Sequence, residues 1–130
     1  TDMTLRSLLS RAVGAGSEKA GTAHWWMQRV TAIALLALGL WFVVSIRSLD
    51  HYAEADFVAW VADPVNAVML LLLIFTIAWH SMLGLQVVIE DYVHGPTPKV
   101  VLLLISKFAH VFLGVAGVFA ILKVALGELP

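Results

Sequence analysis

Long apolar stretches separated by short polar segments set the pattern of this 130-residue chain. A helix needs about 20 apolar residues to cross the roughly 30 Å hydrocarbon core of a bilayer. Residues 30–46, 65–89 and 100–126 meet or approach that length, and the first two stretches carry no charge. The third contains Lys107 and Lys123, which is unusual inside a span. The pattern therefore predicts three membrane-spanning helices.

Charged and turn-forming residues mark the ends of these spans. Arg29 and Arg47 bracket the first span, and their long side chains can reach the membrane interfaces. Asp63 can cap the free amides at the start of the second span, and Pro64 fits a first helical turn. Residues 95–98, with the sequence Gly-Pro-Thr-Pro, predict a turn that ends the second span and precedes the third.

Three further segments are expected to lie at the membrane surface. Apolar side chains recur at helical spacing in residues 5–13, beside Arg6 and Arg11, which predicts a short N-terminal surface helix. Residues 24–29 contain two adjacent tryptophans and predict an interfacial belt. Residues 50–63 combine acidic and aromatic side chains and predict another surface helix between the first two spans.

Composition supports the membrane setting and excludes several classes of function. Of all residues, 61% are hydrophobic and 13% are charged, and the mean hydropathy is +0.92. A soluble core of this size could not bury so much apolar surface. The net charge is -1 and no extended basic face is present, so nucleic acid is not expected as a partner. The chain has no cysteine and can supply neither a disulfide nor a thiolate-held cluster.

The positions of lysine and arginine predict the orientation of the spans, because short cytoplasmic loops are enriched in these residues. The expected fold is all-α, with three transmembrane helices, the N-terminus in the cytoplasm or the mitochondrial matrix, and the C-terminus outside. Residues 1–29 would form an N-terminal cytoplasmic segment and interfacial belt, and residues 30–130 a three-helix membrane domain. The basic residues on the N-terminal side are Arg6, Arg11, Lys19, Arg29 and Lys99, and those on the opposite side are Arg47 and Lys123.

His80 is the most informative polar residue inside a predicted span. Asp91 follows it eleven residues later, an advance of about 16 Å and three turns plus about 20°, so the two share one helix face. An imidazole in hydrocarbon needs a partner for each ring nitrogen, and either a haem iron or a hydrogen bond to another helix would provide one. Gly84, one turn along nearly the same face, would leave room for a flat macrocycle or permit close helix packing. Together these residues favour haem ligation by His80.

Asp91 and Tyr92 end the second span at the inner membrane face. The tyrosine hydroxyl can donate a hydrogen bond to a carbonyl oxygen of a quinone. Asp91 could relay protons for quinone reduction or orient a neighbouring group. Alternatively, Tyr92 is an aromatic-belt residue beside a solvated acid, and spacing alone favours this second interpretation.

Lys107 and His110 lie three residues apart in the third span, and His110 is expected at a depth similar to that of His80. A haem held by both histidines of one chain is therefore conceivable. The favoured interpretation is that Lys107 reaches the interface and His110 hydrogen-bonds to a partner helix. The other histidines look interfacial and need no special role: His24, His51 and His94.

With these residues in place, the chain closely resembles the small hydrophobic membrane anchor of bacterial and mitochondrial succinate dehydrogenase, respiratory complex II. The resemblance depends on His80, ten intervening residues and then Asp91-Tyr92, and on the three-span layout. It also depends on the segment Arg-Val-Thr-Ala at residues 29–32. It covers the chain from about Gln28 to the C-terminus.

The resemblance implies that His80 is one axial ligand of haem b and that the larger cytochrome b anchor subunit supplies the other. It also implies that Arg29 meets a haem propionate and that Tyr92 and Asp91 belong to a ubiquinone site. A flavoprotein subunit and an iron-sulfur subunit would dock on the inner face and pass electrons from succinate to quinone. The expected location is the bacterial inner membrane or the mitochondrial inner membrane, with membrane lipid around the spans.

Three alternatives remain open at this point. The anchor of a quinol-fumarate reductase would look similar and serve the reverse reaction. A self-contained b-type cytochrome would use His80 together with His110. A purely structural membrane anchor or assembly protein would bind neither haem nor quinone.

Overall fold

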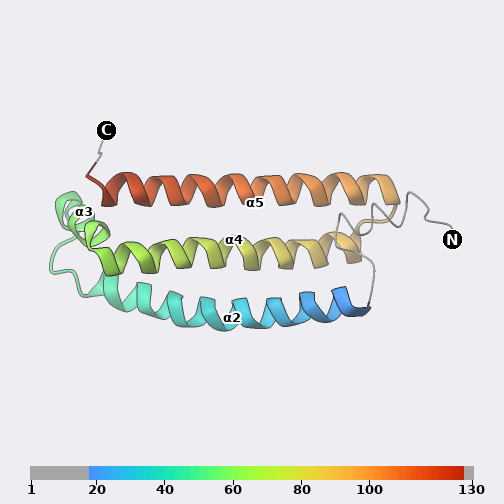
Figure 1. The fold of residues 1–130 in the computed structure, drawn as a ribbon, viewed down its shortest axis with the longest axis horizontal. Coiled ribbons are helices and arrows are strands. Elements are labelled where there is room, and N and C mark those ends of the chain that lie inside the picture. Colours follow the sequence, from blue (N-terminus) through green and yellow to red (C-terminus); the bar gives the residue numbers. More distant parts are fainter. Residues whose placement is uncertain (1–17, 128–130) are drawn as a thin grey trace.

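The computed structural model describes residues 18–127 and shows four helices (Figure 1). These are α2 (Glu18–Arg47), α3 (Glu54–Ala62), α4 (Pro64–Tyr92) and α5 (Pro96–Ala125). No strand occurs in the described range. The predicted all-α fold with three apolar helices long enough to cross a membrane is therefore confirmed. The surface helix expected near residues 5–13 lies outside the described residues.

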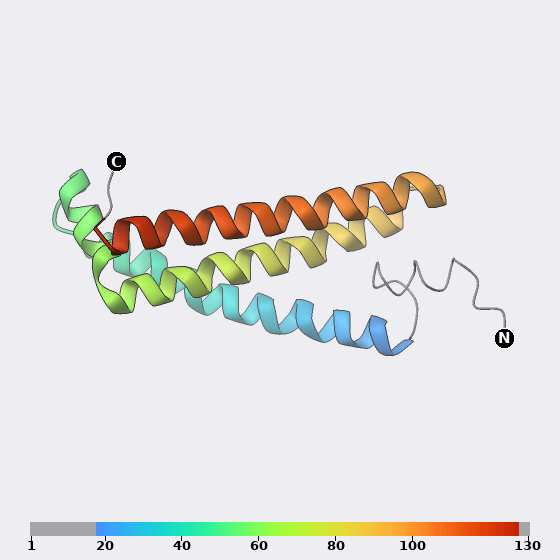
Figure 2. The same ribbon diagram turned by 45° about the horizontal axis from the view of Figure 1, so that its top comes forward.

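The three long helices lie side by side, with α4 between α2 and α5 (Figures 1 and 2). α4 packs along both neighbours, whereas the backbones of α2 and α5 do not approach each other in the described part of the chain. Within the most apolar stretch of each helix, 22% of the residues are buried in α4, against 6% in α2 and 11% in α5. The span in α4 is therefore the most buried of the three. α2 and α5 therefore turn most of their apolar surface outward, which suits a lipid or protein neighbour.

The first membrane helix is longer than the sequence pattern indicated. Its apolar stretch of crossing length runs over Gly21–Arg47, whereas the prediction was residues 30–46. The expected interfacial belt at 24–29 is helical and continuous with this span. Arg29 therefore lies within the helix, well past its first turn, and does not mark its beginning.

The ends of α4 and α5 follow from local chemistry. The Asp63 carboxylate accepts hydrogen bonds from the amides of Val65 (3.0 Å) and Asn66 (3.1 Å), as expected for a helix cap. The turn predicted at residues 95–98 is shorter than expected, because α5 already begins at Pro96. A proline in the first turn loses no helical hydrogen bond, and Gly95 supplies the reversal with a φ of 114°.

The short helix α3 closes one end of the bundle, and it confirms the helix predicted within residues 50–63. Its Trp60 is buried, stacks on Trp41 of α2 with ring centroids 5.9 Å apart, and donates from Nε1 to the Ser45 hydroxyl at 2.8 Å. Trp60, Val61 and Leu70 form a buried apolar cluster between α3 and α4. α3 therefore fixes the distance between the long helices at this end.

Small residues bring α4 and α5 together along the middle of the bundle. A Cβ atom added to Gly117 would lie 3.0 Å from Cγ2 of Ile74, and one added to Gly114 would lie 3.5 Å from Cβ of Ala78. Close backbone approach of this kind is a common way to associate helices inside a membrane, where burial of apolar surface gives no driving force.

We expect Gly117→Ala to crowd this contact, whereas Gly39→Ala in α2 provides a matched control with nothing within 4 Å of the new methyl group. Both changes gain about 1 kcal/mol of helix propensity. At Gly117 the gain should be offset by about 1–3 kcal/mol of overpacking against Ile74, whose branched side chain cannot withdraw Cγ2 without a rotamer change. Thermal unfolding of the detergent-solubilised protein measures the difference. Equal stabilisation by both changes would contradict this packing.

Candidate functional site

The second and first membrane helices are joined by a hydrogen bond between His80 of α4 and Thr31 of α2. Nδ1 of His80 lies 2.9 Å from Oγ1 of Thr31. Thr31 is buried, with 7% of its surface exposed, and His80 is partly buried. His80 lies twelve residues before the last residue of α4, about 18 Å along the axis, so the pair sits well inside the bundle.

The hydrogen bonds of the Thr31 hydroxyl group favour one of the two neutral forms of His80. Oγ1 donates its single hydrogen to the carbonyl oxygen of Met27 at 2.6 Å, with the carbonyl of Gln28 at 3.2 Å. The same oxygen can then only accept from the histidine. This pattern favours the neutral form of His80 that carries its proton on Nδ1 and a lone pair on Nε2. An imidazole in this state has the form of a metal ligand.

Gly84 lies against α2, one turn beyond His80. A Cβ atom at this position would come within 3.4 Å of Nε2 of Gln28. This contact supports the expectation that Gly84 allows close helix packing. Its other expected role, leaving room for a macrocycle, stays a prediction.

A line of polar side chains on α2 continues from Thr31 toward the start of the helix. Gln28 and His24 follow at spacings of three and four residues, so all three lie on the face that meets α4. Nε2 of His24 and Oε1 of Gln28 are buried and have no hydrogen-bond partner in the described part of the chain, as is also true of Nε1 of Trp79 in α4. Such atoms are costly inside a membrane unless a group outside the described residues pairs with them.

The structure does not bring Arg29 next to His80. Arg29 precedes Thr31 by two residues, about 200° around the helix, and therefore lies on the opposite face of α2. It is exposed, and its guanidinium carbon lies 5.0 Å from the ring centre of Trp25, one turn nearer the start of the helix. The cation is thus directed toward the N-terminal end of α2 and is open to a partner on the outside of the bundle.

Asp91 and Tyr92 lie together in the last turn of α4, and both are exposed. The Tyr92 side chain keeps 78% of its surface accessible. Figure 1 places this end of α4 at the same end of the bundle as the beginnings of α2 and α5. The two residues are therefore accessible to a neighbouring molecule, and their expected roles stay predictions.

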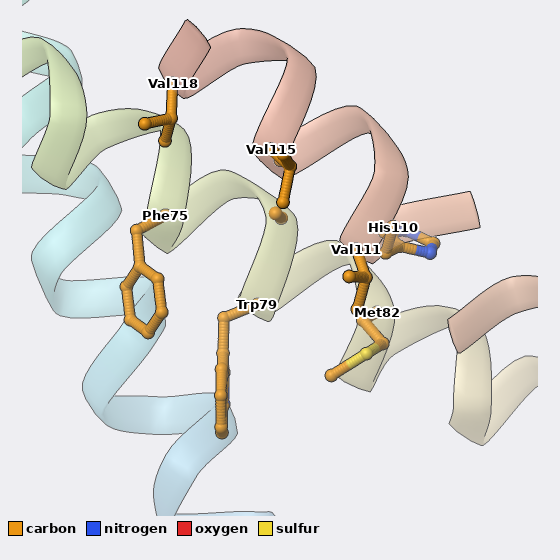
Figure 3. A pocket seen from close by; sticks show the side chains of 9 residues that line it. Phe75, Trp79, Met82, His110, Val111, Val115 and Val118 are labelled. Atoms are coloured by element: carbon orange, nitrogen blue, oxygen red, sulfur yellow. The ribbon is translucent and has the colours of Figure 1, made fainter. Parts of the chain in front are cut away.

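A groove of about 350 Å³ lies between α4 and α5 (Figure 3). Phe75, Trp79 and Met82 from α4 and Val111 and Val115 from α5 project along it. The full set of lining residues is Phe75, Ala78, Trp79, Met82, His110, Val111, Gly114, Val115 and Val118. The groove is almost entirely apolar, and His80 does not line it.

His110 lies on this groove and does not share a site with His80. Its Nδ1 donates to the backbone oxygen of Ser106 at 2.7 Å, one turn earlier in the same helix. This bond is made within α5, and the hydrogen bond expected between His110 and a partner helix stays a prediction. Among the described residues, no cluster of three or more His, Cys, Asp or Glu side chains could hold a metal ion.

Thr31 is the residue of this site that the sequence did not reveal. It forms part of the Arg-Val-Thr-Ala segment, yet nothing in its position along the chain predicts a role of its own. The sequence pattern placed it at the membrane edge, because the first span was expected to begin at residue 30. A helix that begins at Glu18 instead places Thr31 about 20 Å from its start and level with His80.

Comparisons with known proteins agree with the resemblance noted from the sequence. The profile of the family described as succinate dehydrogenase/fumarate reductase transmembrane subunit matches residues 3–121. The succinate dehydrogenase hydrophobic membrane anchor subunit of Rickettsia bellii is 32% identical over 117 residues, which cover 89% of this chain and 93% of that protein. The protein of the same description from Paracoccus denitrificans is 27% identical over 118 residues, covering 91% of each chain.

Proposed function

Because this chain belongs to the succinate dehydrogenase/fumarate reductase transmembrane subunit family and is a multi-pass membrane anchor of succinate dehydrogenase, we propose that it also helps to bind haem b and ubiquinone. The chain would then contribute to transferring electrons from succinate oxidation to quinone in the respiratory chain and tricarboxylic acid cycle. The observation that carries this proposal is the state of His80, with Nδ1 bound to Thr31 and Nε2 left as a base.

The residues around His80 fit a haem that this chain holds in part. His80 would coordinate the iron through Nε2, and the unpaired polar atoms of His24 and Gln28 would lie on the same interhelical seam. A b-type haem would supply a one-electron redox centre. His110 is separate from His80 and lines another surface, so we assign the second ligand to the larger cytochrome b anchor subunit. This arrangement favours a shared haem over a self-contained cytochrome.

Arg29 would neutralise an anion at the outer face of α2, most simply a haem propionate. An exposed guanidinium on a helix of crossing length is costly in hydrocarbon, and its planar fork suits a carboxylate. Its position on the face opposite Thr31 means that the anion would approach from outside this bundle, between this chain and its partner subunit.

Tyr92 and Asp91 would form this chain's part of the ubiquinone site. The Tyr92 hydroxyl can donate to a quinone carbonyl, and this donation becomes stronger as negative charge develops on that oxygen. Asp91, beside it and accessible to water, can pass protons to the reduced quinone. Because both side chains are exposed in this chain, partner subunits would form the remaining walls of the site.

The proposed complex joins this chain to the larger anchor, an iron-sulfur subunit and a flavoprotein subunit in a bacterial or mitochondrial inner membrane. The flavoprotein oxidises succinate, so this chain takes no part in that chemistry. The N-terminal end of α2 and the Tyr92 end of α4 would face the cytoplasm or matrix, where the two soluble subunits dock. A quinol-fumarate reductase would use the same parts, but the Rickettsia and Paracoccus relatives are described as succinate dehydrogenase anchors.

Replacing the proposed ligand tests haem binding directly. His80→Leu should abolish the low-spin spectrum of the purified complex or convert it to another form, because one axial ligand is lost. His110→Leu is the matched control, since it removes the histidine of α5 and should leave the spectrum unchanged. A normal haem spectrum and potential in His80→Leu would exclude His80 as the ligand. Loss of the haem spectrum in both variants would support the alternative of a self-contained cytochrome that uses His80 together with His110.

The charge and the shape of Arg29 can be separated by a conservative change. Arg29→Lys keeps the cation but loses the bidentate fork, so we expect lower haem occupancy and a shifted haem potential. Arg47→Lys, in the last turn of the same helix, is the control and should alter neither. If Arg29→Lys matches the wild-type complex in both measurements, Arg29 serves only as a positively charged marker of membrane topology.

Removing one hydroxyl group tests the quinone site. Tyr92→Phe should reduce quinone reductase turnover roughly 30- to 1000-fold, as expected for about 2–4 kcal/mol of transition-state hydrogen bonding. Succinate oxidation with an artificial acceptor at the soluble subunits should stay unchanged. Tyr52→Phe changes the only other tyrosine, which is 74% exposed in the α2–α3 connection, and should affect neither activity. Full quinone reductase activity in Tyr92→Phe would place the quinone site elsewhere.

A further inference from the structure

Thr31 makes two hydrogen bonds that only a hydroxyl group can combine. It donates to the Met27 carbonyl at 2.6 Å and accepts from His80 Nδ1 at 2.9 Å. We propose that Thr31 is a positioning residue, which holds His80 in the Nδ1-protonated form and directs Nε2 toward the iron. This inference rests on the proposed haem ligation by His80 and adds to it the group that prepares the ligand.

The geometry of α2 makes Thr31 a fixed acceptor. The bond to the carbonyl one turn earlier holds the hydroxyl in one rotamer, and the β-branched side chain restricts its rotation further. The residue is buried to 7% exposure, so water does not compete for its oxygen. His80 Nδ1 therefore lies 2.9 Å from an acceptor that is held in place, and this contact restricts the orientation of its ring.

The contact also determines how strongly the imidazole donates to iron. A hydrogen bond from Nδ1 to an oxygen increases the basicity of the opposite nitrogen, and such supporting contacts commonly affect metal affinity about 10- to 100-fold. A more basic ligand stabilises the oxidised iron more than the reduced iron. Loss of the Thr31 hydroxyl should therefore weaken haem binding and raise the haem potential.

Other hydroxyl groups in the bundle show that this arrangement is specific. Thr76 of α4 is equally buried, at 8% exposure, and donates to the carbonyl of Leu72 at 2.7 Å. That bond stays within its own helix and reaches no histidine. Thr76 therefore shares the residue type, burial and back-bond of Thr31 and lacks only the contact with His80, which makes it a matched control.

The test compares Thr31→Val, Thr31→Ala, Thr31→Ser and Thr76→Val in the assembled complex. The first two changes should speed haem transfer to an excess of apo-globin by about 10- to 100-fold and shift the haem potential upward. Thr31→Ser keeps the hydroxyl and should restore the wild-type potential and haem retention, and Thr76→Val should leave both unchanged. Wild-type potential and haem retention in both Thr31→Val and Thr31→Ala would overturn the positioning role.

A measurement on the unaltered complex does not depend on any variant folding. With histidine labelled with ¹⁵N, NMR of the reduced, diamagnetic haem should show a proton on His80 Nδ1 that exchanges slowly with water. Rapid exchange there would also overturn the inference. The two proposals can fail separately. Retention of haem by His80→Leu would overturn the proposed haem ligation by His80. Loss of haem in His80→Leu, together with wild-type behaviour of Thr31→Val, would overturn only the positioning role of Thr31.

Discussion

The absence of water from the bilayer core is the constraint on which this bundle depends, since every polar group in a span must find its partner within protein or ligand. Most polar side chains of α4 do so locally. Thr76 and Ser81 donate to carbonyls one turn earlier, at 2.7 Å each, and Gln86 donates to Glu90 at 2.9 Å. His80 instead bonds to the neighbouring helix. That hydrogen bond joins α2 to α4 and favours one register and rotation between the two helices. The contact between Gln28 and Gly84 lies on the same interface.

The opposite side of α4 is held by different forces. Gly117 and Gly114 of α5 meet Ile74 and Ala78, so this contact depends on close packing and dispersion, with no polar pair to fix it. The central helix thus has one polar seam and one apolar seam. The polar seam carries the candidate ligand, and the apolar seam can vary in sequence as long as small residues remain. The unpaired polar atoms of His24 and Gln28 lie on the α2 side, whereas the apolar groove beside His110 includes Trp79, whose Nε1 is also buried without a partner among the described residues.

The sequence predicted the features that depend on local composition. Three spans, the Asp63 cap and the helix within residues 50–63 follow from apolar length, capping chemistry and amphipathic spacing, and all are present. It did not predict contacts that depend on how helices are rotated against each other. The pairing of Thr31 with His80 is of this kind, because no local pattern encodes which residue of α2 lies level with a residue 49 positions later. α2 also begins earlier than the predicted span, because the polar residues before residue 30 continue the helix.

Most of the polar groups that the described part of the chain leaves incomplete lie at one end of the bundle, and Nε1 of Trp79 in the middle of α4 is the exception. His24, Gln28, Arg29 and Tyr92 all lie toward the end of the bundle where α2 begins and α4 ends, whereas the α3 end is closed by the buried Trp60 cluster. Moving an unpaired polar group from water into an apolar medium such as cyclohexane costs about 4–8 kcal/mol. A chain that functioned alone would lower its free energy by replacing His24 and Gln28 with apolar residues. Their presence at this end suits a membrane anchor subunit, because atoms that destabilise the isolated chain can become specific contacts in the assembled complex.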